Sequence, residues 1–584
     1  MSRDVLIHQV RAAQGAGEAA QGPGGIAAAA AATAQDRPEL RYVLETERPA
    51  DPAELAARIS DAYSITALVE PVFPDEDDAD LSRLYLLRMA SPPTAEIAAS
   101  PFDLAYDLED LFGFVRVEPD LDTELFPTEP DRAETFAMAG DVLGCWVNGS
   151  SPSDRGWAPR MLKAHNAWDY SEAEGRPDRG DGIVIAQVDT GYTGHPELTD
   201  AIDPGQGWDF LGNDNDPLDP LEKILPLDNP GHGTGTASVA VSRGTIEAHS
   251  GGQQGGTGTP GEVTGTAPQA TLVPIRAIRS VVRLTQVNVA RTINLARKRG
   301  FPIITMSLGG FPSIALWYAL RKAVRENILV LAAAGNCVKL VVWPARYDNC
   351  IAVAGINSDR LPWRGSCRGR AVDVSAPGEL IWRAYSKKNG AATDYGADGT
   401  GEGTSYAVAL TAGVAALWLA HHGRNALVAD LAWNETLQDR FRSLLKQTAN
   451  RPGGWDGRRF GAGIVDADAL LRQGPQPPAA TAMMGAAGEP GDSYADLVDA
   501  TFADETAEAV LGAAATTGLS RAEKEKYGLE IIWHTYRARL AASRSITVDS
   551  LARSTETVAP YVSEQLRAVL VRPGTEPLRR LMQP

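Results

Sequence analysis

The sequence holds few residues of the kinds that bind metals or cross-link chains. Only eight histidines and four cysteines occur among 584 residues, and the cysteines are Cys145, Cys337, Cys350 and Cys367. The N-terminus lacks the basic stretch followed by a strongly apolar stretch that is typical of a secretory signal. We therefore expect a cytoplasmic protein whose thiols are free.

Long apolar segments are also missing. The best run, residues 24–34, is too short and too rich in alanine to predict a transmembrane helix. Acidic residues outnumber basic ones. The sequence has 74 aspartates and glutamates but 55 lysines and arginines, which gives a formal net charge of −19. This balance argues against nucleic acids and anionic membranes as partners, since both are bound by clustered lysine and arginine. It is compatible with calcium, which prefers oxygen ligands.

The chain divides into segments of different composition. Residues 157–473 contain short apolar runs separated by helical patterns, which is typical of a parallel sheet buried on both faces. Residues 39–125 show the order strand, helix, strand, strand, helix, strand, a split βαβ arrangement. The sequence thus predicts an α/β protein with a small α+β domain before the main sheet. The other segments are a small-residue leader, a connector, a Pro/Ala linker and a helical tail, at residues 1–38, 126–156, 474–492 and 493–584.

Residues 520–540 of the tail are predicted to form an amphipathic helix. Ser520 and Glu523 have the spacing of a capping box at its start. Such a helix usually packs on the protein's own core, but a regulatory partner protein is the alternative occupant. Its apolar stripe consists of Ile531, Ile532, Tyr536 and Leu540.

Four glycine-containing windows carry the residues of an activated serine. VDTG places Asp189 at the end of a predicted strand, and GHGTGTASV places His232 at the start of a helix. GTSYAVALTAG places Ser405 at the start of another helix, where a serine can also be the N-cap. A serine nucleophile needs an adjacent base, and that base needs an orienting carboxylate. AAAGN ends a further strand in Asn336, whose amide is suited to donate to a developing oxyanion.

These windows resemble the motifs of the subtilisin-like serine proteases (subtilases, peptidase S8). DTG, HGT, SLGG, AAGN and GTS occur in the family's order, and the resemblance covers roughly residues 157–473. It implies a three-layer subtilisin-like fold and a serine endopeptidase that needs no cofactor for its chemistry. In the implied roles, Asp189 orients His232, and His232 is the general base. Ser405 is then the nucleophile and Asn336 the oxyanion donor.

The resemblance also implies where protein or peptide substrates bind. The residues implied to line the P1 pocket and to pair with the substrate backbone are Ser307, Leu308, Gly309, Gly310, Ala334 and Gly335. Val342 and Trp343, near the expected pocket wall, suggest an apolar pocket. Three helix positions depart from the family pattern, and we expect changed packing with retained activity at Gly235, Ala409 and Leu410.

An acidic loop at residues 209–220 resembles a calcium-binding loop found in part of the family. Its candidate ligands are Asp214, Asp216 and Asp219. A solvated acidic turn is the alternative interpretation. The insertion at residues 221–229 would disturb a metal site.

Residues 39–125 resemble the inhibitory propeptide of subtilases, with an unrelated α+β appendage as the alternative. As a propeptide they would make the chain a zymogen, cleaved somewhere within residues 121–156. A plugged binding module with the subtilase fold, or a protease activated by a partner on the C-terminal helices, also stays open. Because no catalytic residue is missing, the self-inhibited endopeptidase is favoured. High alanine and arginine usage is consistent with a bacterial source.

Overall fold

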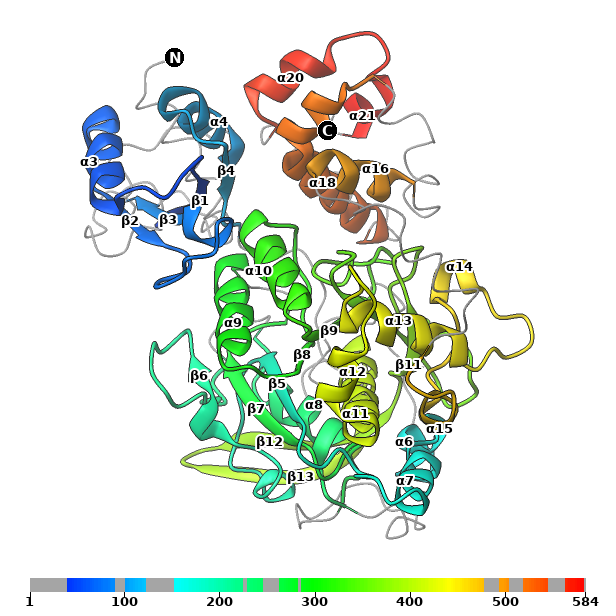
Figure 1. Cartoon of the computed structure of the whole chain (residues 1–584). Helices are drawn as coiled ribbons and strands as arrows, with labels where there is room; N and C mark the ends of the chain where they lie inside the picture. Colours follow the sequence, from blue (N-terminus) through cyan, green and yellow to red (C-terminus); the bar gives the residue numbers. More distant parts are fainter. Residues whose placement is uncertain are drawn as a thin grey trace.

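A computed structural model describes the chain in nine ranges: 39–89, 100–121, 152–223, 228–244, 262–281, 285–476, 493–503, 518–544 and 562–581. The predicted leader, most of the connector with its cleavage zone, and most of the Pro/Ala linker lie outside the described residues. Figure 1 shows a central α/β domain with a small N-terminal domain and a set of C-terminal helices beside each other at one end.

The N-terminal domain has the predicted order of elements. These are β1 (Leu40–Glu45), α3 (Pro52–Tyr63), β2 (Ala67–Pro71), η2 (Leu81–Arg83), β3 (Leu84–Met89), α4 (Pro101–Phe112) and β4 (Arg116–Pro119). The sheet order is β2-β3-β1-β4, and all its pairs are antiparallel. Both helices begin with a polar N-cap followed by proline, since Asp51 and Ser100 accept hydrogen bonds from Ala53 N and Phe102 N.

A seven-stranded parallel sheet forms the centre of the molecule. Its strands are β5 (Val184–Asp189), β6 (Trp208–Asp209), β7 (Thr271–Arg276), β8 (Ile303–Met306), β9 (Leu329–Ala333), β10 (Ile351–Ile356) and β11 (Val374–Pro377). The strand order is β11-β10-β9-β8-β5-β7-β6. Five of these strands were predicted from their apolar runs, and they are mostly apolar because both faces of the sheet are covered.

Helices cover each face of this sheet. On one face lie α9 (Gln286–Lys298) and α10 (Ile314–Arg325), which share an apolar cluster with Ala186 and Val188 of β5. On the other lie α8 (His232–Val241) and α11 (Thr404–His422), which share a cluster with Ile185. The sheet is thus the middle layer of a three-layer fold, and the helices on its two faces are the outer layers. The domain also contains α6 (Trp157–Met161), α7 (Ala164–Ala173), η3 (Pro196–Leu198), η4 (Pro204–Gln206), α12 (Arg424–Ala429), α13 (Leu437–Thr448), α14 (Gly457–Phe460) and α15 (Ala467–Arg472).

Helix α11 is long and apolar enough to cross a membrane by length and composition, and it is the single such helix in the described part of the chain. Its membrane-length window is completely buried inside the protein. It is therefore the central core helix of this domain, which explains why its sequence is apolar all round.

A hairpin next to α8 was not predicted. Strands β12 (Ile381–Asn389) and β13 (Ala392–Gly401) form a two-stranded antiparallel hairpin next to α8. The hairpin leads directly into α11, so it lies next to the chain that carries Ser405.

The C-terminal region folds as helices α16 (Tyr494–Phe502), α18 (Arg521–Arg544), α20 (Glu564–Leu570) and α21 (Glu576–Leu581). The capping box is confirmed, because Ser520 N donates to Glu523 Oε2 at 2.9 Å and Glu523 N donates to Ser520 Oγ at 3.2 Å. Within the predicted stripe, Ile531, Ile532 and Tyr536 are fully buried against the rest of the chain. These three residues therefore pack on the protein's own core, whereas the side chain of Leu540 lies outside the described residues.

The expectation of free thiols is wrong for one cysteine. Cys337 is disulfide-bonded, whereas Cys350 and Cys367 are free and buried. Cys145 lies outside the described residues.

Candidate active site

The side chains of Asp189 and His232 are joined by a hydrogen bond. Asp189 is the last residue of β5, and His232 is the first residue of α8. The Nδ1 of His232 lies 2.7 Å from Asp189 Oδ1, which also accepts from Thr190 N at 2.7 Å. The second oxygen, Oδ2, accepts from Thr236 Oγ1 at 3.1 Å. Because the carboxylate accepts at Nδ1, the proton of neutral His232 is held there and Nε2 is left as the basic nitrogen.

Two glycines let these turns approach each other. A Cβ on Gly233 would overlap the carbonyl oxygen of Gly191 and lie 3.3 Å from Asp189 Cβ. Gly191 also has a φ of +105°, which disfavours any residue with a side chain. The glycines of DTG and HGT are thus required for the contact between aspartate and histidine.

Ser405 lies in the first turn of α11. Gly403 is the N-cap of this helix, with a φ of 153°, so the interpretation of Ser405 as the N-cap is wrong. The Oγ of Ser405 donates a long hydrogen bond of 3.4 Å to Ser307 O, and Ser307 Oγ donates to Ser405 O at 3.1 Å. The ring of the next residue, Tyr406, lies 6.4 Å from the His232 ring. The serine and the histidine therefore belong to the same edge of the sheet.

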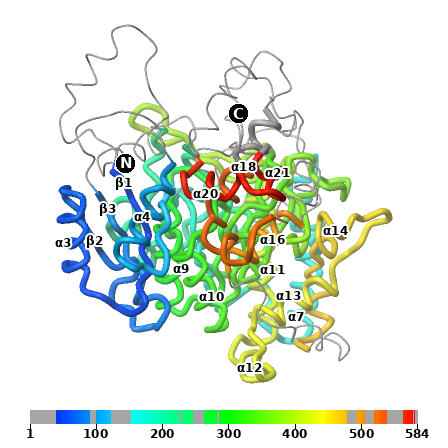
Figure 2. Tube along the Cα trace, turned by 90° about the horizontal axis from the view of Figure 1, so that it is seen from above, coloured from blue at the N-terminus to red at the C-terminus, as the bar shows by residue number. Residues whose placement is uncertain are grey.

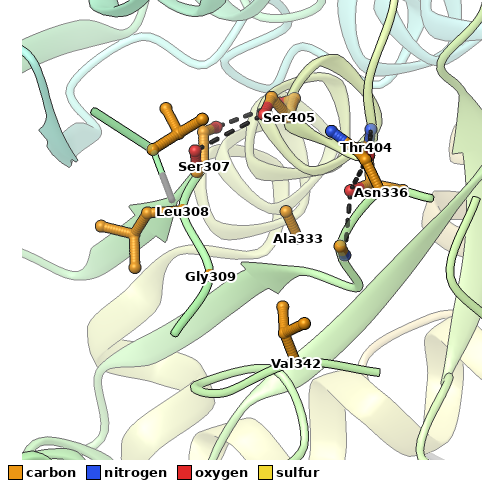
Figure 3. Close-up of a pocket in the computed structure, with 10 residues that line it drawn as sticks. Ser307, Leu308, Gly309, Ala333, Asn336, Val342, Thr404 and Ser405 are labelled. Atoms are coloured by element: carbon orange, nitrogen blue, oxygen red, sulfur yellow. Dashed lines mark hydrogen bonds between the residues drawn. The ribbon is translucent and has the colours of Figure 1, made fainter. Parts of the chain in front are cut away.

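Asn336 is held in one orientation beside Ser405. Its Oδ1 accepts from both Thr404 N and Thr404 Oγ1 at 3.0 Å, and Gly335 N donates to the same Thr404 hydroxyl at 3.0 Å. Because a backbone N–H can only donate, the oxygen of the amide must face Thr404. The amide nitrogen then lies on the side of Gly403, where a Cβ would be 3.3 Å from Nδ2. Figure 3 shows these contacts.

A pocket opens next to Ser405 (Figure 3). Together with the open solvent at its mouth, it measures about 340 Å³. Its lining consists of Val281, Ser307, Leu308, Gly309, Ala333, Gly335, Asn336, Val342, Thr404 and Ser405. The Ser405 hydroxyl, the Asn336 amide and an apolar pocket thus lie together at the carboxyl ends of the strands, where parallel sheets place their sites.

The subtilase family model matches residues 180–463 of the chain. Thermitase from Thermoactinomyces vulgaris is 34% identical over 277 residues, which are 47% of this chain and 85% of thermitase. The chain belongs to the subtilase family. Halolysin from Haloferax mediterranei is 30% identical over 53% of this chain and 52% of its own length. Subtilisin BL from Lederbergia lenta is 28% identical over 51% of this chain and 94% of its own length.

As a subtilase, the chain is a serine endopeptidase, acts on proteins or peptides, and needs no cofactor for catalysis. The matched range leaves out the N-terminal domain and the C-terminal helices. Those parts are therefore interpreted from the structure alone.

The pocket of this subtilase contains four of the six predicted substrate-binding residues: Ser307, Leu308, Gly309 and Gly335. Gly310 and Ala334 do not line it and instead form backbone hydrogen bonds with the Val342–Trp343 segment. Gly310 N donates to Trp343 O at 2.8 Å, and Val342 N donates to Ala334 O at 3.0 Å. Sequence reasoning missed Val281, Ala333 and Thr404. Thr404 could have been found from the sequence, because it is the threonine of the GTS motif.

Val342 limits the width of the pocket. A Cβ on Gly309 would lie 2.5 Å from Val342 Cγ2, and a Cβ on Gly335 would lie 2.8 Å from the same atom. The valine side chain is thus inserted between two glycine walls.

The departure from the family pattern at Gly235 has a packing reason. A Cβ there would lie 3.4 Å from Arg383 Cδ and from Ala384 O, so strand β12 occupies the space of a larger side chain. Ala409 and Leu410 are buried in α11. All three positions are packing positions, as expected.

The predicted calcium ligands do not fit a metal site. Asp219 already accepts from Thr190 Oγ1 at 2.8 Å, Gly231 N at 2.7 Å and Leu221 N at 2.9 Å. Asp214 and Asp216 are exposed. No group of three or more His, Cys, Asp or Glu side chains suited to a metal occurs in the described part of the chain. The contacts of Asp219 instead tie the turn after Asp189 to the turn before His232.

Proposed function

We propose that this subtilase hydrolyses peptide bonds with Ser405 as its nucleophile. In this proposal His232 is the general base, Asp189 orients it, and Asn336 Nδ2 together with Ser405 N–H stabilises the oxyanion. The observation that carries the proposal is the 2.7 Å contact of Asp189 with His232. The locked amide of Asn336 beside Ser405 supports it.

The chemistry follows from these positions. The Ser405 hydroxyl attacks the scissile carbonyl, and its proton passes to Nε2 of His232. The developing negative charge on the carbonyl oxygen is stabilised by the amide donors, which need no reorganisation because Thr404 holds Asn336 in place. His232 then gives the proton to the leaving amine. A water, deprotonated by the same nitrogen, hydrolyses the acyl-enzyme and restores Ser405.

The pocket beside Ser405 is proposed to hold the P1 side chain. Segment 307–310 lies along it, and the substrate backbone would pair there as an added strand. Val342 between the glycine walls favours P1 residues of modest size.

We also propose that the N-terminal domain inhibits the protease. Two of its carboxylates bind helix N-termini of the catalytic domain, where backbone N–H groups and the helix dipole favour negative charge. Glu118 Oε2 accepts from Ile314 N of α10 at 2.9 Å. Asp120 Oδ1 accepts from Gln286 N of α9 at 3.1 Å. Both residues are buried, which supports a stable association.

The C-terminal helices strengthen this association. Tyr106 OH of α4 donates to Glu530 of α18 at 3.0 Å, and the Phe102 ring lies 5.8 Å from the Trp533 ring. Arg116 of β4 forms an ion pair with Glu525. Figure 2, a view from above, shows α20 beside α4, with α16 and α18 over the central domain. Ile531, Ile532 and Tyr536, three residues of the apolar stripe on which the partner-activated alternative rested, are also buried.

The test is the intact mass of the purified wild type beside Ser405→Ala. We expect the wild type to be clipped within residues 121–156 and the variant to remain whole, because clipping needs the nucleophile. If both keep their full length, the self-processing proposal fails. The plugged binding module is then the better interpretation, provided that Ser405 also resists covalent labelling.

A further inference from the structure

A tyrosine from the C-terminal helices lies behind the pocket. Tyr536 of α18 is fully buried. Its hydroxyl donates to Val341 O at 2.6 Å, across 195 residues of sequence. Val341 immediately precedes Val342, whose side chain limits the pocket width.

The ring of Tyr536 contacts the back of both pocket walls. It lies 5.4 Å from the ring of Trp343, which follows Val342. It lies 5.9 Å from the ring of Phe311, which follows segment 307–310. Trp343 and Phe311 are both buried, at 0% and 2% exposure, so neither can move without displacing a neighbour.

The backbone between these contacts is fixed. Gly310 and Trp343 exchange two hydrogen bonds, of 2.8 and 3.3 Å, and Val342 N donates to Ala334 O. A displacement of the Val341–Trp343 segment therefore moves Val342 between Gly309 and Gly335. Since the valine methyl occupies the space that a Cβ on either glycine would need, a shift of a few tenths of an ångström changes the usable width.

A second contact joins the C-terminal helices to the same segment. Arg346 donates to Ala500 O of α16 at 2.9 Å, and its guanidinium lies 5.6 Å from the centre of the Trp343 ring. The C-terminal region thus supports the pocket from two helices.

We infer that Tyr536 is a positioning residue for P1 specificity, which makes the C-terminal helices part of the substrate-binding apparatus. This inference rests on the proposed function of the pocket. Tyr536 touches no substrate; it acts through Val341, Trp343 and Phe311. Without its ring, the wall has a void into which Trp343 can relax, and Val342 follows. Without its hydroxyl alone, Val341 O loses its buried donor, and the displacement is smaller.

The experiment compares the full-length wild type, Tyr536→Ala, Tyr536→Phe and Tyr527→Ala on peptide anilides that differ only at P1 (Ala, Leu or Phe). Tyr527 is the matched control, because it is also a buried tyrosine of α18 but contacts Tyr106 of the N-terminal domain, with ring centres 5.3 Å apart. Val342→Ala is the positive control for a wider pocket. Active-site titration with a fluorophosphonate corrects every rate for the fraction of active enzyme.

For Tyr536→Ala we expect the ratio of kcat/KM for P1 Phe over P1 Ala to rise about tenfold, mainly through a lower KM for P1 Phe. The kcat for P1 Ala should stay within about threefold, because Ser405 and His232 are untouched. Tyr536→Phe should raise the ratio about two- to fourfold. If Tyr536→Ala does not fold, Tyr536→Phe alone tests the inference. Tyr527→Ala should leave the ratio unchanged.

A ratio within 1.5-fold of wild type in both Tyr536 variants would overturn the inference while leaving the proposed function intact. An equal loss on all three substrates would also overturn it, since that is the result of a purely structural role. A wild type that cleaves nothing and is not labelled contradicts the proposed function, and the inference then falls with it.

Discussion

Tyr494, the first residue of α16, donates a 2.6 Å hydrogen bond to Glu118 in β4, 376 residues earlier in the chain. The other oxygen of Glu118 accepts from Ile314 at the start of α10. One buried carboxyl group therefore joins the N-terminal domain, the catalytic domain and the C-terminal helices. The proposed inhibition depends on this three-way contact.

Tyr494→Phe should loosen the N-terminal domain. The variant removes a hydrogen bond and leaves a buried carboxyl oxygen of Glu118 without its donor, which costs about 1–3 kcal/mol. In a Ser405→Ala background, we expect amide hydrogens of residues 114–118 to exchange about tenfold faster. Tyr192→Phe is the matched control, because that hydroxyl donates to the exposed Asp216 at 3.2 Å. Equal exchange in Tyr494→Phe and its parent would show that the contact does not hold the domain.

Asp219→Ala should impair catalysis although the Asp219 side chain does not touch the substrate. The carboxylate ties Thr190 to Gly231, and both adjoin residues of the proposed triad. For Asp219→Ala we expect kcat to fall about 10- to 100-fold, while KM stays within twofold of the wild type. Asp219→Asn should retain part of the activity, because its amide oxygen can still accept a hydrogen bond. Steady-state kinetics at a temperature where circular dichroism shows folded protein checks this. A kcat within twofold of wild type in the alanine variant would remove Asp219 from the account.

Asn336→Ala should lower kcat far more than it changes KM, because the oxyanion forms only after attack. The loss of such a donor in subtilisin, a relative of this chain, costs about 10²–10³ in kcat, and we expect the same order here. Thr404→Val should cost less, since it removes one of the two hydrogen bonds that orient Asn336. If Asn336→Ala instead raised KM at unchanged kcat, the amide would serve substrate binding.

Asp103 should make the association of α4 with the C-terminal helices pH-dependent. Burial, helped by the nearby carboxylates of Glu530 and Glu564, raises the pKa of Asp103 to about 6, although the Glu564 N–H and Arg567 oppose the shift. The folded state thus favours the protonated acid, so stability is highest below the ordinary pKa of about 4 and falls as pH rises to about 6.

The measurement is the melting temperature of Ser405→Ala with and without Asp103→Asn, between pH 4 and 7. The asparagine variant lacks the titrating group, so its melting temperature relative to the parent should rise by about 1–3 °C over this range. The difference between the two proteins isolates Asp103 from all other titrating groups. A constant difference would mean that Asp103 does not titrate there.

Much of the fold was predictable because it depends on local patterns. The elements of the N-terminal domain have clear periodicity, and α3 and α4 have proline just after a capping residue. The central strands are continuous apolar runs. Asp189, His232, Asn336 and Ser405 stood out because the glycines that their close packing requires are visible in the sequence.

The rest could not be predicted, for physical reasons. The hairpin β12–β13 carries many polar and small residues, so its strands show no apolar alternation. The contact of Tyr536 with Val341 joins distant parts of the chain, and no local pattern reports it. The acidic character of residues 209–220 suggested a metal, but the orientation of Asp219 toward Thr190 is decided by tertiary packing.

The central claim is that Ser405 is a nucleophile activated by His232. The most direct measurement treats the wild type and His232→Ala with a fluorophosphonate, before and after trypsin removes the N-terminal domain, and maps the adduct by peptide mass spectrometry. The account predicts one adduct on Ser405 in the wild type, more of it after the domain is removed, and none in His232→Ala. An unlabelled Ser405 in the wild type under both conditions would contradict the account.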